Sequence, residues 1–400
     1  MSMKIIGKVF VKPKSEKKIK NFYLWIYRDE ISKVSFSREM EGWVDIVNDR
    51  GEFICKGFYS PKSSNPVKVF SYDNDFDINT EVKKRVLFSF ENRKKMIGNG
   101  VLDKNNFRVV YSESDFLPGL IIDKYGDFFG IQIRNRLFEN LKDVVVDTLL
   151  TLLEAKNIYE RSYGDYREKD EKLEPRNIPI KGSIPSLIRI REEDIQFVFD
   201  PLRGQKTGFF LDQFINRKIV AAMCHKGMKV LDVFSYVGGF GIYCAKKGAD
   251  VISIEKNEYY SDLIKENIKS NGVKDRVRVV TGDAFEKIKE IDEKFDIVVL
   301  DPPTFVKSLS ESRKRLPMLI DLIKHSLALL KPEGKLIIFT CSYNLLKEHF
   351  IASIRIAAME LGIRIRVDGE LMQSPDHPWV IQMPETLYLK GLIVSKLPSF

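Results

Sequence analysis

The sequence is poor in cysteine and histidine, which excludes several kinds of site. It has four of each in 400 residues, and no CxxC or HxxxH spacing occurs. So few cysteines, without close pairing, argue against a disulfide-stabilised secreted domain, and the spacing predicts no metal site. We therefore expect a protein of the reducing cytoplasm.

Long hydrophobic runs are also missing. A membrane-spanning helix needs roughly 18 consecutive apolar residues, and no run approaches this length. The first residues, "MSMKIIGKVFVKPKSEKK", have no long apolar core before their charges, so no secretory signal is expected. A chain of 400 residues with 44% apolar residues predicts a globular protein of two or three domains with no membrane partner.

The net charge of +9 is unevenly distributed. Residues 1–100 contain 20 Lys and Arg against 13 Asp and Glu, a net charge of +7. A solvated basic surface would explain this excess, but clustered cations also attract the phosphates of a nucleic acid and release counterions. We therefore expect RNA as a partner, bound through the basic N-terminal region and the part of the chain that follows it.

Three regions differ in pattern. In residues 1–72, apolar and polar residues alternate on both sides of the turn signal Asn48-Asp49-Arg50-Gly51, which predicts a hairpin in a small β-barrel. Residues 73–195 mix amphipathic helices with three strands around 107–133, and predict an α+β domain. The charged, proline-rich stretch 163–186 predicts a loop or linker.

Residues 196–400 alternate strands with helices. The strands are "KVLDVF", "DVISIE", "VRVVTG", "FDIVVLDPP" and "KLIIFTCS". This order predicts a doubly wound, Rossmann-like α/β domain with a parallel sheet. The expected fold is thus α/β overall, with a barrel at the N-terminus and a central α+β domain.

Polar residues follow these strands in turn, where ligands bind in such sheets. Asp232 ends the first strand, Glu255 the second, Asp283 follows the third and Asp301 the fourth. An acid after the second strand can bind both hydroxyls of a ribose, as in sites for NAD and for S-adenosyl-L-methionine. Each acid alone could be a helix cap or a surface charge, but four at successive strand ends indicate a cofactor site.

The turn after the first strand shows which of the two cofactors, NAD or S-adenosyl-L-methionine, the sequence favours. A dinucleotide site needs G-x-G-x-x-G so that the backbone can approach a pyrophosphate, and here no third glycine follows Gly239 and Gly241. Phe234 and Tyr236 would also crowd a pyrophosphate. A looser turn around Gly238 suits S-adenosyl-L-methionine, which has no phosphate, and Asp283 is placed for its adenine amino group.

Cys341 follows the fifth strand, in "TCS", and the fourth and fifth strands should be neighbours, roughly 4.8 Å apart. A free cysteine is often simply part of the core, so its position in the fold must distinguish a core residue from a nucleophile. Beside Asp301 and a methyl donor, a thiolate could add to carbon 6 of cytosine, which makes carbon 5 nucleophilic. An acid at ring nitrogen 3 would assist. The pattern therefore favours Cys341 and Asp301 as catalytic residues.

Nearly the whole chain resembles the ribosomal RNA large subunit methyltransferase I family, whose members form 5-methylcytosine in 23S-type rRNA. The similar motifs are "SDFLPGLIIDKYGD", "KTGFFLDQ", "DVFSYVGGF", "DPPTF" and "TCS". The resemblance implies that Cys341 is the nucleophile and Asp301 its acid partner, and that Asp232, Phe234, Glu255 and Asp283 hold the donor. It also implies that the barrel is an RNA-binding PUA domain and that large-subunit rRNA is the substrate.

Two other functions stay open from the residues alone. An exocyclic N-methyltransferase acting on an RNA purine would also use Asp301-Pro302-Pro303 but would need no cysteine, and a non-catalytic RNA-binding protein would need no intact donor site. Cys55, Cys224 and Cys244 are expected to be structural, and His377 to lie on a surface loop. A homodimer is compatible with the sequence.

Overall fold

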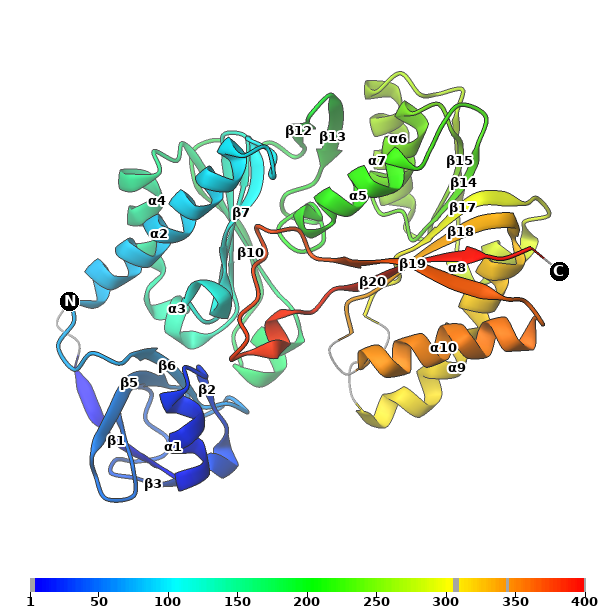
Figure 1. Ribbon diagram of the computed structural model, residues 1–400. Helices are drawn as coiled ribbons and strands as arrows, with labels where there is room; N and C mark the ends of the chain where they lie inside the picture. The colour runs from blue at the N-terminus through cyan, green and yellow to red at the C-terminus, as the bar shows by residue number, and fades with distance from the viewer. Residues whose placement is uncertain (1–3, 305–308, 343–344, 399–400) are drawn as a thin grey trace. The chain divides into compact units, whose positions relative to one another are not determined.

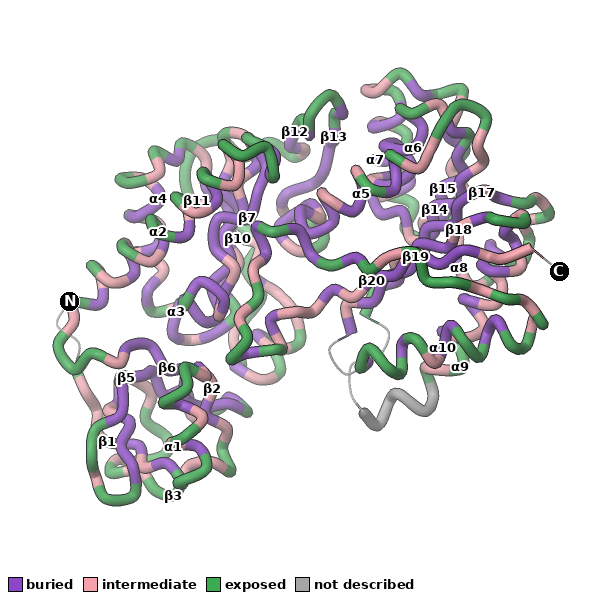
Figure 2. The backbone as a smooth tube through the Cα atoms, viewed as in Figure 1, coloured by how far each residue is buried: buried purple, intermediate pink, exposed green. Residues whose placement is uncertain are grey.

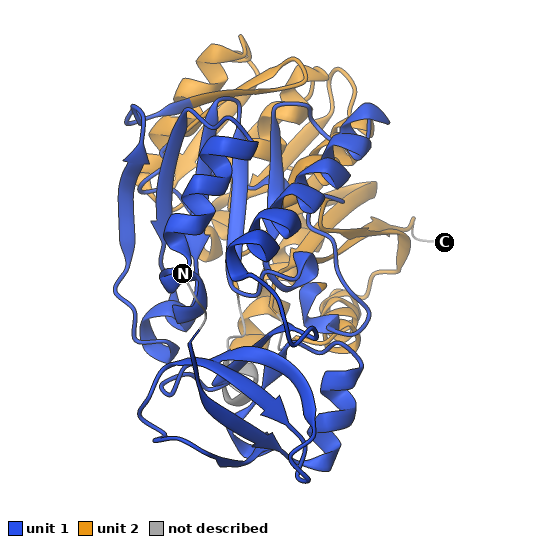
Figure 3. Cartoon of the chain, turned by 90° about the vertical axis from the view of Figure 1, so that its left-hand side faces the viewer, with its two compact units in different colours: residues 1–188, 200–211, 375–386 blue, residues 189–199, 212–374, 387–400 orange. Residues whose placement is uncertain are grey.

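The computed structural model describes residues 4–304, 309–342 and 345–398 (Figure 1). Contacts divide the chain into two compact units, which Figure 3 shows in different colours. The first comprises residues 1–188, 200–211 and 375–386, and the second residues 189–199, 212–374 and 387–400. The chain thus crosses between the units several times. The domain boundaries predicted from the sequence, 1–72, 73–195 and 196–400, stay predictions.

The first unit begins with the expected small β-domain. Its six-stranded sheet has the order β2-β6-β5-β4-β1-β3, in which β1 and β4 are parallel and the other pairs antiparallel. The strands are β1 (Ile5–Val11), β2 (Trp25–Ile26), β3 (Ile31–Val34), β4 (Gly42–Val47), β5 (Phe53–Tyr59) and β6 (Val67–Ser71), with α1 (Pro13–Lys20) after β1. Cys55 is fully buried in their shared core, as expected.

The predicted hairpin is present between β4 and β5. The Asn48 side chain fixes the turn, because its Oδ1 accepts the backbone N–H groups of Arg50 at 3.1 Å and of Glu52 at 3.0 Å. Gly51 has φ +86°, a conformation that glycine adopts without steric cost. The local sequence therefore determines this turn.

A second sheet in the same unit has five strands in the order β11-β10-β9-β8-β7. They are β7 (Asn106–Tyr111), β8 (Leu120–Tyr125), β9 (Phe128–Ile133), β10 (Asn157–Ser162) and β11 (Arg176–Lys181), with helices α2 (Ile78–Gly98), α3 (Arg136–Asn140) and α4 (Lys142–Leu152). Only β9 and β10 are parallel, and α3 and α4 connect them. The apolar faces of α2 and α4 pack on this sheet and bury a core that includes Val82, Val145 and Ile131.

The prediction that 163–186 is a loop or linker was wrong for much of the stretch. It contains a π-helical turn, Tyr166–Asp170, and β11. Glu171 is fully buried and accepts from Lys68 and from Ser60 of the first sheet's region, and Asp170 accepts from Ser63 at 2.9 Å. Charges that suggested an exposed linker are therefore satisfied by partners distant in sequence.

The prediction that His377 lies on a surface loop was also wrong. The residue is 1% exposed, and its ring packs against that of Tyr111 with centroids 5.5 Å apart. The preceding Asp376 is held by α2 and β7, since its carbonyl accepts from Arg93 at 3.0 Å and its carboxylate from the backbone N–H of Arg108 at 2.8 Å. Prolines at 375 and 378 suggested an exposed loop, but contacts elsewhere in the first unit bury Asp376 and His377 between them.

The second unit has a seven-stranded sheet in the order β16-β15-β14-β17-β18-β20-β19. Its strands are β14 (Lys229–Val233), β15 (Asp250–Glu255), β16 (Val277–Thr281), β17 (Phe295–Leu300), β18 (Leu330–Thr340), β19 (Ile365–Met372) and β20 (Lys390–Lys396). Its helices are α5 (Phe214–Ala222), α6 (Gly239–Lys246), α7 (Glu258–Ser270), α8 (Ala284–Lys287), α9 (Leu309–Ala328) and α10 (Lys347–Glu360), and β12 (Ile188–Glu192) pairs with β13 (Ile195–Phe199). The first five strands of the sheet are parallel, and β20 is antiparallel to both neighbours.

This sheet confirms the predicted doubly wound fold. Its central strands are buried along most of their length (Figure 2), which fits their largely apolar sequences. The strand order reverses between β14 and β17, and in such sheets the crevice at the reversal is where ligands bind. In the described part of the chain, no helix is both long and apolar enough to cross a membrane.

Candidate active site

The predicted site residues lie where the five parallel strands end. The register pairs Val233 with Ile254 and with Leu300, so the ends of β14, β15 and β17 are level. Leu300 in turn pairs with Ile338 of β18, which confirms that the fourth and fifth parallel strands are neighbours. One edge of the sheet therefore carries all the predicted residues.

Asp232 lies in β14 and fixes the start of α6. Its side chain is 1% exposed, and Oδ2 accepts the backbone N–H of Gly241 at 3.0 Å. A Cβ on Gly241 would come within 3.1 Å of that oxygen and 2.8 Å of Ser253 Oγ, so glycine is required there. Burial raises the pKa of Asp232 to about 7, the Gly241 hydrogen bond opposes this, and the charge of Glu255 adds to it.

The turn between β14 and α6 has an unusual backbone. Phe234 has φ +66°, Tyr236 +54° and Gly238 +84°. Side chains other than glycine rarely adopt such angles, and when they do the residues tend to cluster at ligand sites. The turn is held by its surroundings, because the Tyr236 ring packs edge-on against Tyr260 at 4.7 Å and its N–H donates to Glu255.

Glu255, at the end of β15, is half-buried and its carboxylate is fixed by the backbone. Oε2 accepts from Tyr236 N at 2.9 Å and Oε1 from Asn257 N at 2.8 Å. Burial raises its pKa, and these backbone hydrogen bonds counteract the rise. Each carboxylate oxygen can accept two hydrogen bonds, so both have capacity to accept hydroxyl donors of a ligand.

Asp283 follows β16 and begins α8. Its Oδ1 accepts the N–H of Phe285 at 3.0 Å, and Oδ2 forms an ion pair with Lys256 at 2.8 Å. The Lys256 ammonium lowers the pKa of this partly exposed carboxyl group. Asp283 is therefore a helix cap, and its exposed side leaves it accessible to a ligand at the same edge.

Asp301 follows β17 and is oriented by a glutamine that the sequence analysis did not single out. Gln213 Nε2 donates to Asp301 Oδ2 at 2.9 Å. Asn216 on α5 holds this glutamine, since its Nδ2 donates to Gln213 Oε1 at 2.6 Å and to the carbonyl of Met372 at 3.0 Å. Gln213 and Asn216 are almost fully buried, so the amide chain fixes the carboxylate in one orientation. Only the tertiary fold reveals this role.

Cys341 follows β18 and is half-buried, which sets it apart from the fully buried Cys55 and Cys244. Its Sγ lies 3.3 Å from the hydroxyl Oγ1 of Thr304, which comes from the segment after β17. Thr340 and Ser342 on either side are buried. The thiol thus lies at the same edge as the strand end that carries Asp301.

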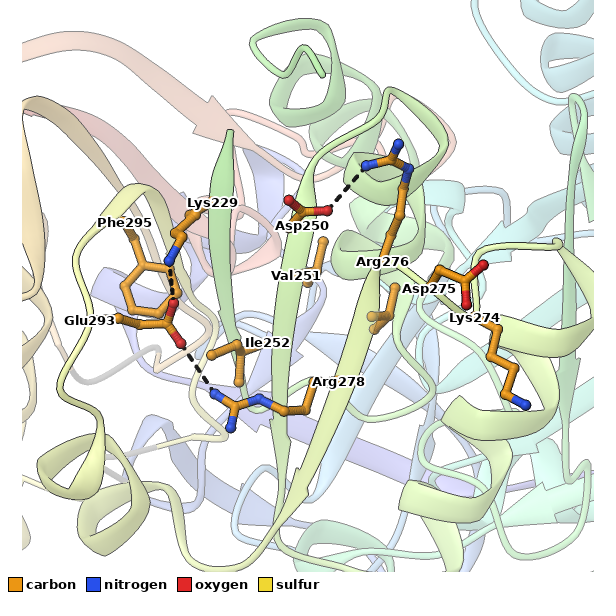
Figure 4. A pocket seen from close by; sticks show the side chains of 11 residues that line it. Lys229, Asp250, Val251, Ile252, Lys274, Asp275, Arg276, Arg278, Glu293 and Phe295 are labelled. Atoms are coloured by element: carbon orange, nitrogen blue, oxygen red, sulfur yellow. Dashed lines mark hydrogen bonds and ion pairs between the residues drawn. The ribbon is translucent and has the colours of Figure 1, made fainter. Parts of the chain in front are cut away.

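A hollow of about 460 Å³ lies at the opposite edge of the sheet, where β14, β15, β16 and β17 begin (Figure 4). Three of the four cations that line it are paired with neighbouring acids: Lys229 and Arg278 with Glu293 at 2.7 and 3.2 Å, and Arg276 with Asp250 at 3.1 Å, while Lys274 is the fourth. These ion pairs satisfy most of the charges that a polar ligand would need. We therefore do not regard the hollow as the functional site.

The strand-end residues fit S-adenosyl-L-methionine. The turn from Asp232 to Gly241 contains no Lys or Arg that could bind a pyrophosphate, whereas the edge carries the acids Asp232, Glu255 and Asp283. Acids suit a cofactor with a cationic sulfonium and an amino group, and Glu255 suits its ribose hydroxyls. When bound, this cofactor supplies an electrophilic methyl group.

Two family models match the chain. Residues 9–72 match a PUA-like domain, and residues 190–317 match the TRM5/TYW2 methyltransferase domain. Together with the sheet and its strand-end acids, these matches define the class of the protein: a methyltransferase dependent on S-adenosyl-L-methionine, with a PUA-like N-terminal domain. The cofactor and the fold class predicted from the sequence are thereby confirmed.

A relative in Tolumonas auensis, ribosomal RNA large subunit methyltransferase I, is 34% identical over 396 residues, covering 97% of this chain and 99% of the relative. The protein of the same name in Alteromonas mediterranea is 31% identical, covering 97% and 98%. The chain belongs to the ribosomal RNA large subunit methyltransferase I family, which confirms the resemblance seen in its motifs.

A solved structure assigned as a SAM-dependent methyltransferase, from Streptococcus mutans, has the same fold. It matches with a TM-score of 0.82 at 21% identity and covers 97% of this chain and 99% of that one.

Proposed function

We propose that the chain methylates carbon 5 of a cytosine in large-subunit, 23S-type rRNA, in the cytoplasm, through a covalent adduct between Cys341 and carbon 6. The names of its relatives support the rRNA substrate, and its PUA-like domain and the positive charge of residues 1–100 support RNA binding. The observation that carries the reaction type is the half-buried thiol of Cys341 at the strand-end edge, next to the strand that leads to Asp301.

The proposed reaction balances as follows. The Cys341 thiolate forms a bond to carbon 6, and the electron pair of the 5,6 double bond moves to carbon 5. Carbon 5 takes the methyl group from the sulfonium, whose carbon–sulfur bond breaks. The proton on carbon 5 leaves to a base, the sulfur–carbon 6 bond breaks, and the double bond and the free thiol return.

Asp301 has a defined part in this proposal. Gln213 engages Oδ2 of its carboxylate, and the carboxyl group assists at ring nitrogen 3 of the base while the thiolate adds. Asp232, Phe234, Tyr236, Gly238, Glu255, Asp283 and Asp301 form the donor site. These assignments rest on their shared position at the strand ends.

Trapping with fluorinated RNA tests the proposal. RNA carrying 5-fluorocytosine should form an adduct with the wild-type protein that survives denaturant, because fluorine cannot leave as a proton does. Cys341→Ser should still bind donor and RNA but lose methyl transfer by several orders of magnitude, since a hydroxyl is a far weaker nucleophile.

Cys224→Ser is the matched control, because Cys224 is also half-buried but lies after α5. It should trap RNA normally. Full methyl transfer by Cys341→Ser would contradict the covalent mechanism and leave an N-methyltransferase acting through Asp301-Pro302-Pro303 as the better interpretation.

A further inference from the structure

Lys390, the first residue of β20, is a half-buried lysine without an acidic partner in the described part of the chain. Its Nζ donates to the carbonyl oxygen of Ser342 at 3.2 Å. Burial lowers the pKa of Lys390. The negative charge of the Cys341 thiolate acts in the other direction and raises this pKa, and no carboxylate contributes to the shift. The ammonium group of Lys390 is therefore partly shielded from water and is held by a backbone carbonyl, not by a carboxylate.

The fold brings Lys390 to the thiol through the antiparallel insertion of β20. The register pairs Lys390 with Thr340, the residue before Cys341, and Gly391 with Phe339. The Lys390 ammonium then reaches the carbonyl of Ser342, the residue after Cys341. Strand pairing with Thr340 and a hydrogen bond to Ser342 thus place Lys390 beside both neighbours of Cys341 in the chain.

We propose that Lys390 is a positioning residue for Cys341, whose ammonium group stabilises the thiolate form of the side chain. This inference rests on the proposed function, in which Cys341 is the nucleophile. The thiol proton passes to solvent, Lys390 keeps its three protons throughout, and the thiolate is then available to form the bond to carbon 6. A cation beside a cysteine is a recognised way to favour the thiolate at neutral pH.

Other charged groups at this edge have partners of their own. Asp301, after β17, is engaged by Gln213. Glu370 on β19 is paired with Lys347 of α10 at 2.6 Å. Thr304, which contacts the sulfur, is uncharged. Lys390 is thus a cation that interacts electrostatically with the thiol and is not neutralised by a neighbouring acid among the described residues.

A purely structural role is the competing explanation, and the chain offers a matched control. Lys396, at the other end of β20, is also half-buried and donates to a backbone carbonyl, that of Leu330, at 3.1 Å. Burial lowers its pKa as well, but no thiol contributes to the shift. Loss of either lysine should affect the strand to a similar degree, while only loss of Lys390 should affect Cys341.

The experiment is the pH profile of alkylation at Cys341, measured by iodoacetamide labelling and peptide mass spectrometry on the full chain. Relative to wild type, Lys390→Met should raise the midpoint by about one pH unit or more, which slows labelling at pH 7 by about tenfold. Lys390→Arg keeps the positive charge, so its midpoint should stay close to that of wild type. Lys396→Met should leave the midpoint unchanged. Cys224 in the same molecules is an internal reference thiol.

An unchanged midpoint in folded Lys390→Met, or an equal shift in Lys396→Met, would overturn the inference. If Lys390→Met does not fold, the wild-type protein provides the test. The alkylation midpoint of Cys341 in the folded chain must then lie below that of Cys341 in the denatured chain. A midpoint at or above the denatured value refutes the proposal. The 5-fluorocytosine adduct is measured separately. A lowered midpoint without an adduct would refute the covalent mechanism and leave the role of Lys390 intact.

Discussion

At the scale of single residues, Glu255 combines a fixed position with free acceptor capacity. Two backbone N–H groups hold its carboxylate, one from the turn after β14 and one from the start of α7. A ligand that presents two adjacent hydroxyls meets acceptors that need no reorganisation. This preorganisation is why the residue should contribute to affinity for the methyl donor.

We expect Glu255→Ala to weaken binding of S-adenosyl-L-methionine by about tenfold or more, since a lost hydrogen bond in a buried site costs on the order of 1–3 kcal/mol. Isothermal titration calorimetry measures the change. Glu258→Ala, an exposed glutamate in the first turn of α7, is the control and should bind normally. Equal affinity in Glu255→Ala would remove Glu255 from the donor site.

Asp232 predicts a pH effect on stability. Its folded-state pKa is raised from 3.8 to about 7, mainly by burial, so between these values the folded state binds more protons than the unfolded state. Its contribution to stability is therefore fully present below about pH 4 and is lost as the pH rises through 7, at about 1.4 kcal/mol per unit.

Asp232→Asn keeps an acceptor oxygen for Gly241 N but cannot ionise. We expect its free energy of unfolding to fall less than that of wild type between pH 4 and 8, measured by urea denaturation across that range. Donor binding should weaken in the same variant. Parallel pH profiles for the two proteins would show that Asp232 does not titrate in this range.

At the scale of elements, the buried pair Lys68–Glu171 ties the π-helical turn to β6. Both side chains are almost fully buried. Tyr166, in the same turn, donates to Asn65 at 2.6 Å, and Ser64 N donates to Asp170 at 3.0 Å. These contacts explain why a charged segment is ordered: its acids meet the donors of the loop between β5 and β6.

Glu171→Ala should lower the free energy of unfolding of the first unit by about 3–5 kcal/mol, because it leaves the Lys68 ammonium buried without its partner. Thermal or urea denaturation measures the loss. Glu168→Ala, in the same turn but exposed, should change stability little. The double variant Lys68→Met/Glu171→Leu should be more stable than Glu171→Ala alone, and a loss as large as in the single variant would contradict this account.

At the scale of the whole molecule, the structure changes how the basic N-terminal region should be tested. Phe58 and Phe70, on β5 and β6, pack into the core of the five-stranded sheet, and Met383 packs into the core of the barrel. Removal of residues 1–72 would therefore expose apolar surface and an unpaired Glu171. Surface substitutions are the cleaner experiment.

Lys12, Lys14 and Lys17 are exposed at the start of α1. Their triple replacement by Gln should weaken rRNA binding and reduce the slope of log affinity against log salt, by about 0.7–0.9 for each phosphate that the protein no longer neutralises. Filter binding over a range of salt concentrations measures this. Replacement of the exposed Lys246, Lys247 and Lys274 of the second unit changes the net charge by the same amount and should affect the slope less. Equal effects of the two triple variants would mean that the barrel has no special role in RNA binding.

The sequence by itself determined the features that depend on local pattern. Short strands dominated by apolar residues, alternating with helices, indicated the parallel sheet, and Asn48 with Gly51 indicated the hairpin, because turn geometry and strand burial are set by neighbouring residues. Since parallel strands all end at one edge, the order of the chain was enough to gather Asp232, Glu255 and Asp301 there. The family motifs indicated the same site.

Only the tertiary structure decided which polar residues meet across long sequence separations. His377 and Glu171 were predicted to be exposed because their local sequence is rich in proline or charge, yet partners in β7 and the barrel bury them. Gln213 ends the motif KTGFFLDQ, but nothing in that motif indicated its contact with Asp301, and Lys390 gave no local signal. Lys390 lies 48 residues from Ser342 along the chain and reaches it only because β20 inserts antiparallel between β18 and β19, a pairing that depends on sheet register and not on the amino acids around either residue.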